Sequence, residues 1–139
     1  MASFLSEVTK AGPGTRFALA LESSGHVVVP ELEVAVESAA RKKGLLGRDE
    51  LAQGCGLVIA PTNAVHTFFM RFPIDILFVT RAGELIKISR AVRPWRAAAA
   101  LRGYAVVELA AGGAARAGLR VGDRVTVRRR ESRDAGSFV

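Results

Sequence analysis

The sequence predicts a mainly β fold: a compact, single-domain β-sandwich or small barrel with one or two short helices. Apolar residues alternate with polar ones or run in short blocks, which is typical of strands. Glycine, proline and other turn-forming residues separate these blocks. A chain of 139 residues is long enough to bury one core without disulfides or metals. Short strands must therefore supply most of that core.

Eight apolar blocks are expected to form strands. A hairpin over 74–90 is the clearest unit, because Gly83 can adopt the positive φ that a tight connection between two apolar runs requires. The expected strands, in chain order, cover 16–21, 27–36, 55–60, 65–71, 74–80, 84–90, 104–110 and 124–130.

Helical composition is confined to short stretches. A helix is expected over 37–46, which is rich in alanine, arginine and lysine, with its basic residues toward the carboxyl end. A shorter turn is expected over 113–117, where Gly118 can take the left-handed cap conformation. The stretch 97–101 is a further candidate for a helical turn.

The two ends of the chain differ in character from the middle. Residues 1–15 contain several helix and strand breakers and are expected to form a loosely ordered arm. Residues 16–130 are expected to form the single β-rich domain, and 131–139 a flexible tail.

Net charge restricts the classes of partner. The formal charge of +7 would suit a nucleic-acid ligand, but the arginines are scattered and no helix-turn-helix or ribonucleoprotein motif is present. A nucleic-acid function is therefore not favoured. No apolar run reaches the roughly 18 residues that span a bilayer, so no membrane partner is expected. The start of the chain does not resemble a secretory signal, so we expect a cytoplasmic protein.

Cysteine and histidine are scarce. A single cysteine, Cys55, cannot form an intramolecular disulfide and is expected to be a small buried residue rather than a reactive thiol. His26 and His66 lie in separate segments, so we expect no metal site and no cofactor.

The most apolar stretch of the chain, 66–79, contains three ionisable residues: His66, Arg71 and Asp75. A buried carboxylate is costly unless it is neutralised, paired or hydrogen-bonded. Asp75 can therefore act as a general acid or base, or it can accept hydrogen bonds from backbone amides. His66 can contact a ligand, act as a base, or simply end a strand. Arg71 is a candidate partner for Asp75.

Glu108 stands in another apolar strand. We expect Asp75 and Glu108 to be buried, each with at least two hydrogen bonds or an arginine partner. If Glu108, Asp75 and His66 converge, they can perform acid–base chemistry.

A second cluster combines Trp95 with Arg93 and Arg96. Two guanidinium groups beside an indole can hold an anion or stack on a planar ligand. The alternative is that Trp95 covers one end of the core while its arginines stay solvated. If the loop lies beside the His66 end of its strand, the two form one pocket. The candidate ligand-binding residues are thus His66, Arg71, Asp75, Arg93, Trp95, Arg96 and Glu108.

Four ordered blocks carry a family resemblance. They are 41–48, 55–58, 66–79, and a downstream block that includes Trp95, 107–109 and 118–123. Over about residues 28–128 the chain resembles the domain of unknown function 192 family, also called uncharacterised protein family 0127. The resemblance implies a compact, mostly β domain with a short helix, and it supplies no catalytic mechanism.

Two function classes remain open from the sequence. The first is a module that binds a small anionic or planar ligand, or a protein partner. The alternative is a hydrolase-like enzyme that uses acid–base chemistry of His66, Asp75 and Glu108. The sequence does not decide whether the protein is an enzyme, nor its oligomeric state.

Overall fold

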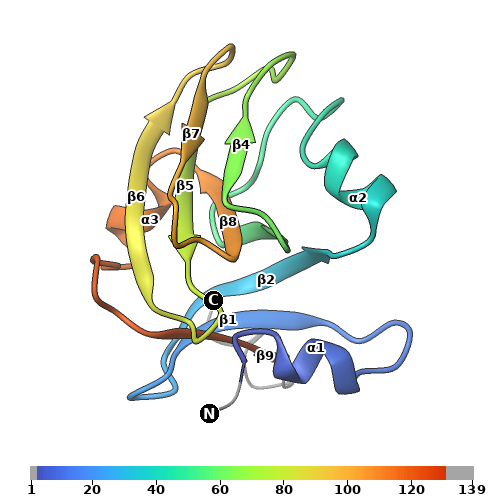
Figure 1. Ribbon diagram of the computed structural model, residues 1–139, viewed down its shortest axis with the longest axis vertical. Coiled ribbons are helices and arrows are strands. Elements are labelled where there is room, and N and C mark those ends of the chain that lie inside the picture. The colour runs from blue at the N-terminus through green and yellow to red at the C-terminus, as the bar shows by residue number, and fades with distance from the viewer. Residues whose placement is uncertain (1–2, 131–139) are drawn as a thin grey trace.

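Nine strands and three short helices make up residues 3–130, the part of the chain that the computed structural model describes (Figure 1). They form one compact domain, and the predicted mainly β fold class is confirmed. Seven strands form one sheet in the order β6-β5-β8-β3-β2-β1-β9, and two form a small second sheet, β4-β7. Neighbours in both sheets are antiparallel except β2 and β3, which run parallel. The strands are β1 (Phe17–Leu21), β2 (Val27–Ala35), β3 (Cys55–Ile59), β4 (Ala64–His66), β5 (Ile74–Val79), β6 (Leu85–Val92), β7 (Ala97–Ala99), β8 (Ala105–Ala110) and β9 (Val125–Arg129).

The large sheet curls until its two edge strands approach each other, but it is not a closed barrel. The edges meet at a single bridge between Glu84 and Arg124. Beside it, the Val125 amide donates to the Gly83 carbonyl at 2.9 Å. Gly83 has φ +95°, and a Cβ there would lie 2.3 Å from the Val125 carbonyl oxygen. Only glycine allows this approach, so the predicted turn glycine of the 74–90 hairpin also brings the sheet edges together.

Each face of the curled sheet covers its own apolar cluster. The inner face carries Leu19, Leu77 and Val107, together with Phe4 from the amino-terminal segment. The outer face carries Ile76, Phe78 and Val106, which pack under the β4-β7 sheet and the chain around Leu45. Figure 1 shows β4 and β7 in front of β5 and β8. Because alternate residues of a strand point to opposite faces, β5 and β8 supply both clusters and are almost wholly buried.

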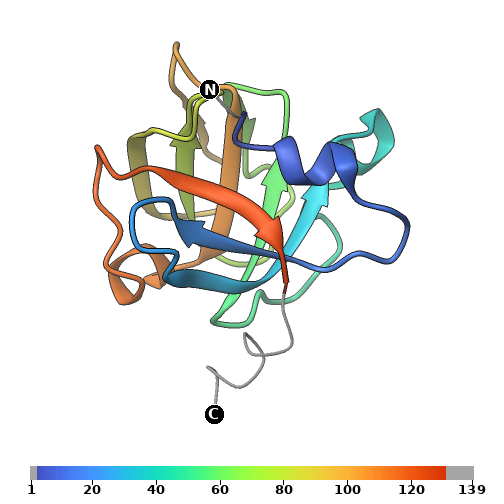
Figure 2. The same cartoon turned by 90° about the horizontal axis from the view of Figure 1, so that it is seen from below.

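The helices are all short and lie at the margins: α1 (Ser6–Lys10), α2 (Ser38–Lys43) and α3 (Gly113–Arg116). The expected arm, 1–15, contains α1, which lies near β9 (Figure 2), and its Phe4 and Leu5 are buried in the core. The expected tail, 131–139, lies outside the described residues. Within residues 3–130, no helix has the length and apolar character needed to cross a bilayer.

Three predicted elements differ from the structure. The strand expected over 65–71 ends at His66, because Phe69 has φ +66° and the chain turns there. The stretch 97–101 contains strand β7 rather than a helical turn, because it pairs with β4. The helix expected over 37–46 ends at Lys43, since Gly44 leaves the helical region at φ 46° and ψ −126°.

Candidate functional site

A pocket of about 300 Å³ opens between α2 and β4, over the outer face of the large sheet. Figure 1 shows where α2 and β4 lie in the fold. Its walls come from the carboxyl end of α2, the turn that follows it, and β4. Its floor comes from β3 and β8. The lining residues are Ser38, Arg41, Lys42, Lys43, Gly44, Leu45, Leu46, Ile59, Pro61, Thr62, Ala64, Val65, His66, Met70 and Glu108.

Glu108 is the acidic group of this pocket. It lies on β8 between Leu57 and Ile76 of the neighbouring strands, and only 3% of its surface is exposed. None of the residues described donates a hydrogen bond to its carboxyl group. Burial raises the pKa of Glu108 to about 7, against a smaller opposing effect of Arg48. The carboxyl group is thus buried and unpaired, yet it lies in the wall of a cavity.

The mouth of the pocket is cationic. Arg41, Lys42 and Lys43 occupy the last turn of α2, where positive charge is favoured by the helix dipole. No residue of α2 is buried, so these side chains keep contact with solvent. Gly44 then turns the chain inward, and a Cβ at this position would lie 3.9 Å from Glu108 Oε1. The turn therefore carries the chain from the cationic rim to the buried carboxyl group.

His66 completes the rim from the other side, at the end of β4. Its Nδ1 accepts a hydrogen bond from the Phe68 amide at 3.2 Å. In the neutral ring the proton then lies on Nε2, which is free to donate to a bound molecule. The imidazole also stacks on the Phe68 ring with centroids 4.7 Å apart. His66 is thereby oriented by its own turn.

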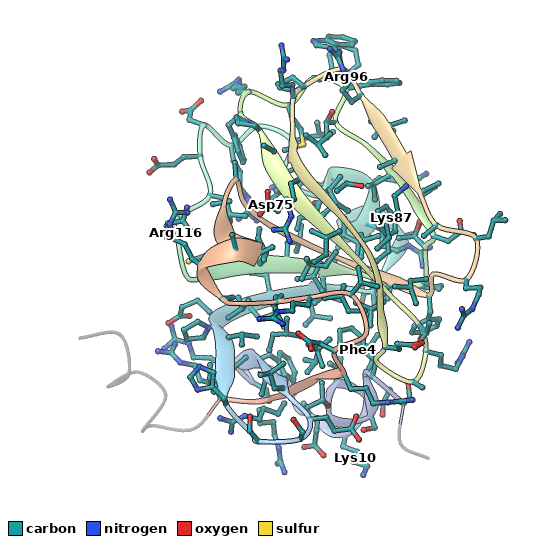
Figure 3. The ribbon with its side chains drawn as sticks, turned by 90° about the vertical axis from the view of Figure 1, so that its left-hand side faces the viewer. Phe4, Lys10, Asp75, Lys87, Arg96 and Arg116 are labelled. Carbon is teal, nitrogen blue, oxygen red and sulfur yellow. The ribbon has the colours of Figure 1, made fainter. Side chains whose placement is uncertain are left out.

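Asp75 does not belong to this pocket. Its cross-strand partner on β8 is Leu109, so it shares the inner face of the sheet, whereas Glu108 opposite Ile76 faces outward. Asp75 Oδ1 accepts from the Ala91 amide at 2.8 Å, and Oδ2 accepts from the Ala114 amide at 3.0 Å. Figure 3 shows Asp75 in the interior beside α3. The proposed convergence of His66, Asp75 and Glu108 is therefore wrong: only His66 and Glu108 share a cavity.

These contacts decide between the two roles considered for Asp75. Its two carboxylate oxygens accept hydrogen bonds from a backbone amide of α3 and from one at a bulge in β6, where Ala91 has φ 47°. Of the two roles considered, that of amide acceptor is therefore the one found. Burial of both carboxyl groups is confirmed, and Asp75 has the two expected hydrogen bonds. For Glu108 the expectation of two hydrogen bonds or an arginine pair is not met among the described residues.

The Trp95 loop lies next to His66, which was the condition for one shared pocket, but none of Arg93, Trp95 and Arg96 lines the pocket that His66 lines. Thr67, completely buried, holds the loop: its hydroxyl donates to the Arg93 carbonyl at 2.7 Å and accepts from the Arg96 amide at 2.9 Å. The rings of Phe68 and Trp95 stack with centroids 5.7 Å apart. Trp95 is 56% exposed, so it does not cover the core.

Arg71 is not a partner of Asp75, because it forms an exposed ion pair with Asp49 at 2.6 Å. Arg93 and Arg96 are exposed at the loop. The seven candidate residues therefore divide into a pocket pair, His66 and Glu108, and groups outside it. Sequence reasoning missed the contribution of α2 to the pocket. A signal was present, since the basic run and the two glycines of 41–48 form one block of the family resemblance.

Cys55 was expected to be buried, but it is only half-buried, at a second, wider cavity of about 760 Å³ beside β2. Burial, followed by the nearby Glu31 and Glu33, raises the pKa of its thiol. The protonated thiol is therefore favoured, which agrees with a structural residue. In residues 3–130 no three His, Cys, Asp or Glu side chains are grouped so that they could hold a metal ion.

The fold and the pocket define a class of protein. It is a single domain built on one large curled sheet, with a buried carboxyl group in a cavity whose rim is cationic. The DUF192 family model, described as an uncharacterized ACR, matches residues 19–127. The chain belongs to the DUF192 family, and the resemblance seen in the sequence is confirmed.

Two solved structures share the fold. A protein of unknown function from Novosphingobium aromaticivorans DSM 12444 is 29% identical, with a TM-score of 0.67 over 79% of this chain and 82% of its own. A protein from Sinorhizobium meliloti 1021, whose name suggests a transcription regulator, is 25% identical, with a TM-score of 0.70 over 81% of this chain and 92% of its own. No curated protein matches the chain.

Proposed function

We propose that the protein is a binding module for a small organic anion that also carries a hydrogen-bond donor, held in the α2–β4 pocket. The observation that carries this proposal is the unpaired Glu108 carboxyl group in the pocket wall. Buried polar groups are nearly always hydrogen-bonded, so a buried residue whose carboxyl group has no described donor and faces a cavity supports a partner that enters it. An N–H or O–H group of the partner would satisfy the carboxylate form of Glu108.

The rest of the pocket specifies the other end of the ligand. Arg41, Lys42, Lys43 and the Nε2 of His66 present positive charge or donors at the mouth. Leu45, Ile59 and Met70 give the interior an apolar character, as in most small-molecule sites. A carboxylate or phosphate group at the mouth, a short apolar body and a hydroxyl or amino group at Glu108 would match these three features. The planar ligand considered from the sequence is less well supported, since Trp95 lies outside the lining.

A thermal-shift panel tests the proposal directly. Hydroxy acids, amino acids and sugar phosphates would be added to the purified protein, and the midpoint of unfolding measured. A ligand at 100 times its Kd should stabilise the protein by about 2.7 kcal/mol. Glu108→Gln and the double variant Lys42→Gln/Lys43→Gln should lose the shift. Lys10→Gln, which removes a lysine from the end of α1 instead, should keep it.

Two results would contradict the proposal. One is the absence of any shift across the panel for the wild-type protein. The other is a shift of equal size in Glu108→Gln, which would place the ligand elsewhere.

A second candidate function is acid–base catalysis by Glu108 and His66. These two residues are what is left of the hydrolase hypothesis once Asp75 is removed from the site. The specific observation in its favour is the pKa of about 7 for Glu108 in a pocket that His66 also lines. A group with such a pKa can both give and take a proton near neutral pH. Turnover of ester or phosphoester substrates that disappears in Glu108→Gln, with wild-type folding, would favour catalysis over binding alone.

A further inference from the structure

Three exposed aromatic side chains gather at one end of the molecule. Phe68, Phe69 and Trp95 are 39%, 70% and 56% exposed. Their rings form one continuous group, with 5.7 Å between the centroids of Phe68 and Trp95 and 4.6 Å between those of Phe69 and Trp95. We call these residues, with Arg93 and Arg96, the aromatic tip. Single exposed apolar residues are ordinary, but a contiguous group marks an interaction surface.

The fold holds this tip outward. Phe69 and Trp95 both have positive φ, 66° and 67°, a conformation that bulky residues rarely adopt. The buried Thr67, which precedes Phe68, holds the Trp95 loop in place. Its amide donates to the Arg96 carbonyl, and its carbonyl accepts from the Trp95 amide. Such conformations persist where the surrounding structure over-determines them, and they cluster at functional sites. The rings are therefore presented to solvent by a rigid support.

The charge around the tip has one sign. No acidic residue occurs between Glu84 and Glu108, whereas that stretch contains five basic residues: Lys87, Arg90, Arg93, Arg96 and Arg102. Asp49 is already paired with Arg71. Figure 3 shows Arg96 at the opposite end of the molecule from Lys10. The tip is thus an apolar projection with a cationic border.

We infer that the aromatic tip docks the protein onto the surface of an anionic lipid bilayer. Tryptophan and phenylalanine settle at the level of the lipid headgroups, and flanking arginines gain energy from anionic lipids. This inference is independent of the proposed ligand pocket. We expected no membrane partner because no apolar run is long enough to span a bilayer, but docking at the bilayer surface requires no spanning helix.

A single-stranded nucleic acid is the competing partner for aromatic rings beside arginines. Nucleic-acid platforms need ring faces that are free to stack on bases. Here Phe68 lies between the rings of His66 and Trp95, with centroid distances of 4.7 and 5.7 Å. The mutual stacking favours insertion of the group as one wedge into the headgroup layer.

Trp95 supplies the measurement, since it is the only tryptophan of the chain. The full-length protein would be titrated with phosphatidylcholine vesicles that contain phosphatidylglycerol, and with vesicles of phosphatidylcholine alone. We expect sedimentation with the anionic vesicles together with a blue shift of the Trp95 emission. Added salt should weaken binding, because it screens the attraction of the arginines.

Two variants and their controls locate the contact. Phe69→Asn removes the most exposed ring and suits the positive φ, and it should weaken vesicle binding about tenfold or more. Arg93→Gln/Arg96→Gln should have an effect of similar size. Leu101→Asn, at an apolar side chain 97% exposed outside the tip, should leave binding unchanged. Lys10→Gln/Arg120→Gln removes two charges outside the tip and should weaken binding much less than the arginine pair.

The remaining outcomes would overturn the inference. These are no binding to either vesicle type, binding without a change in Trp95 emission, or binding that Phe69→Asn leaves intact. A concentration-dependent dimer that Phe69→Asn dissociates would assign the tip to a second copy of the chain. Tighter binding of single-stranded DNA, with quenching but no blue shift of Trp95, would assign it to nucleic acid.

Discussion

Asp75 and Glu108 lie on adjacent antiparallel strands, one residue out of step, and for that reason point to opposite faces of the sheet. Asp75 is opposite Leu109, while Glu108 is opposite Ile76. On the inner face, Asp75 accepts two backbone amides. On the outer face, Glu108 has no donor among the described residues and lines the α2–β4 pocket. Two carboxyl groups in similar strands thus meet different surroundings, which are backbone amides for Asp75 and a pocket for Glu108.

Replacement of Asp75 tests its structural role. Asp75→Ala leaves the Ala91 and Ala114 amides without their acceptor, so it should lower the free energy of unfolding by about 1 to 3 kcal/mol. Urea unfolding monitored by circular dichroism measures the change. Asp49→Ala, which removes an exposed ion pair with Arg71, is the control and should change stability by less than about 1 kcal/mol. Equal effects of the two substitutions would contradict the assignment.

Glu108 should make stability depend on pH. Its pKa rises from 4.5 to about 7 on folding because burial disfavours the charged form. Between these values the unfolded state loses its proton while the folded state keeps it, so stability falls as pH rises from about 4.5 to about 7. The fall should amount to about 3 kcal/mol.

Glu108→Gln should remove this part of the pH dependence, because glutamine does not titrate. The difference in unfolding free energy between Glu108→Gln and wild type should therefore shift in favour of the variant as pH rises over that range. Glu22→Gln, at an exposed carboxylate away from the pocket, controls for surface charge. A difference that stays constant from pH 4.5 to 8 would show that Glu108 is not buried in its acid form.

Gly83 provides a test of how the sheet edges meet. Gly83→Ala places a Cβ 2.3 Å from the Val125 carbonyl oxygen, which forces β6 and β9 apart and should cost about 3 kcal/mol or more. Gly25→Ala is the matched control, since Gly25 also has positive φ, +73°, but has no atom within 4 Å of the added Cβ. It should cost only about 1 kcal/mol. Similar losses in both variants would mean that backbone conformation, and not the approach of the strands, dominates.

The backbone of Phe69 in the aromatic tip should be strained, because its φ is positive. Phe69→Asn replaces a bulky residue at φ 66° with one that tolerates this conformation, so the free energy of unfolding should rise by about 0.5 to 1 kcal/mol. Phe68 does not have a positive φ, and its ring stacks on His66. Phe68→Asn should therefore be destabilising. Thermal unfolding distinguishes the two, and a loss of stability in Phe69→Asn would show that the ring contributes more than the strain.

Much of the architecture was predictable because its signals are local. The apolar blocks at 74–80 and 104–110 have the composition of strands that are buried on both faces, and the structure contains buried strands in both blocks. Phe69 shows where local signals fail: its stretch has strand composition, but tertiary contacts of Thr67 hold it in a turn.

By itself, the sequence determined the β class, the family, most strands and the burial of Asp75 and Glu108, since each follows from composition and alternation along the chain. Only the tertiary structure decided that these two carboxyl groups face apart, that α2 supplies the cationic rim of the pocket around Glu108, and that the Trp95 loop presents its aromatic rings to solvent. The physical reason is that pairing register and the approach of distant segments set what a side chain meets. Neither is encoded within the few residues that surround it.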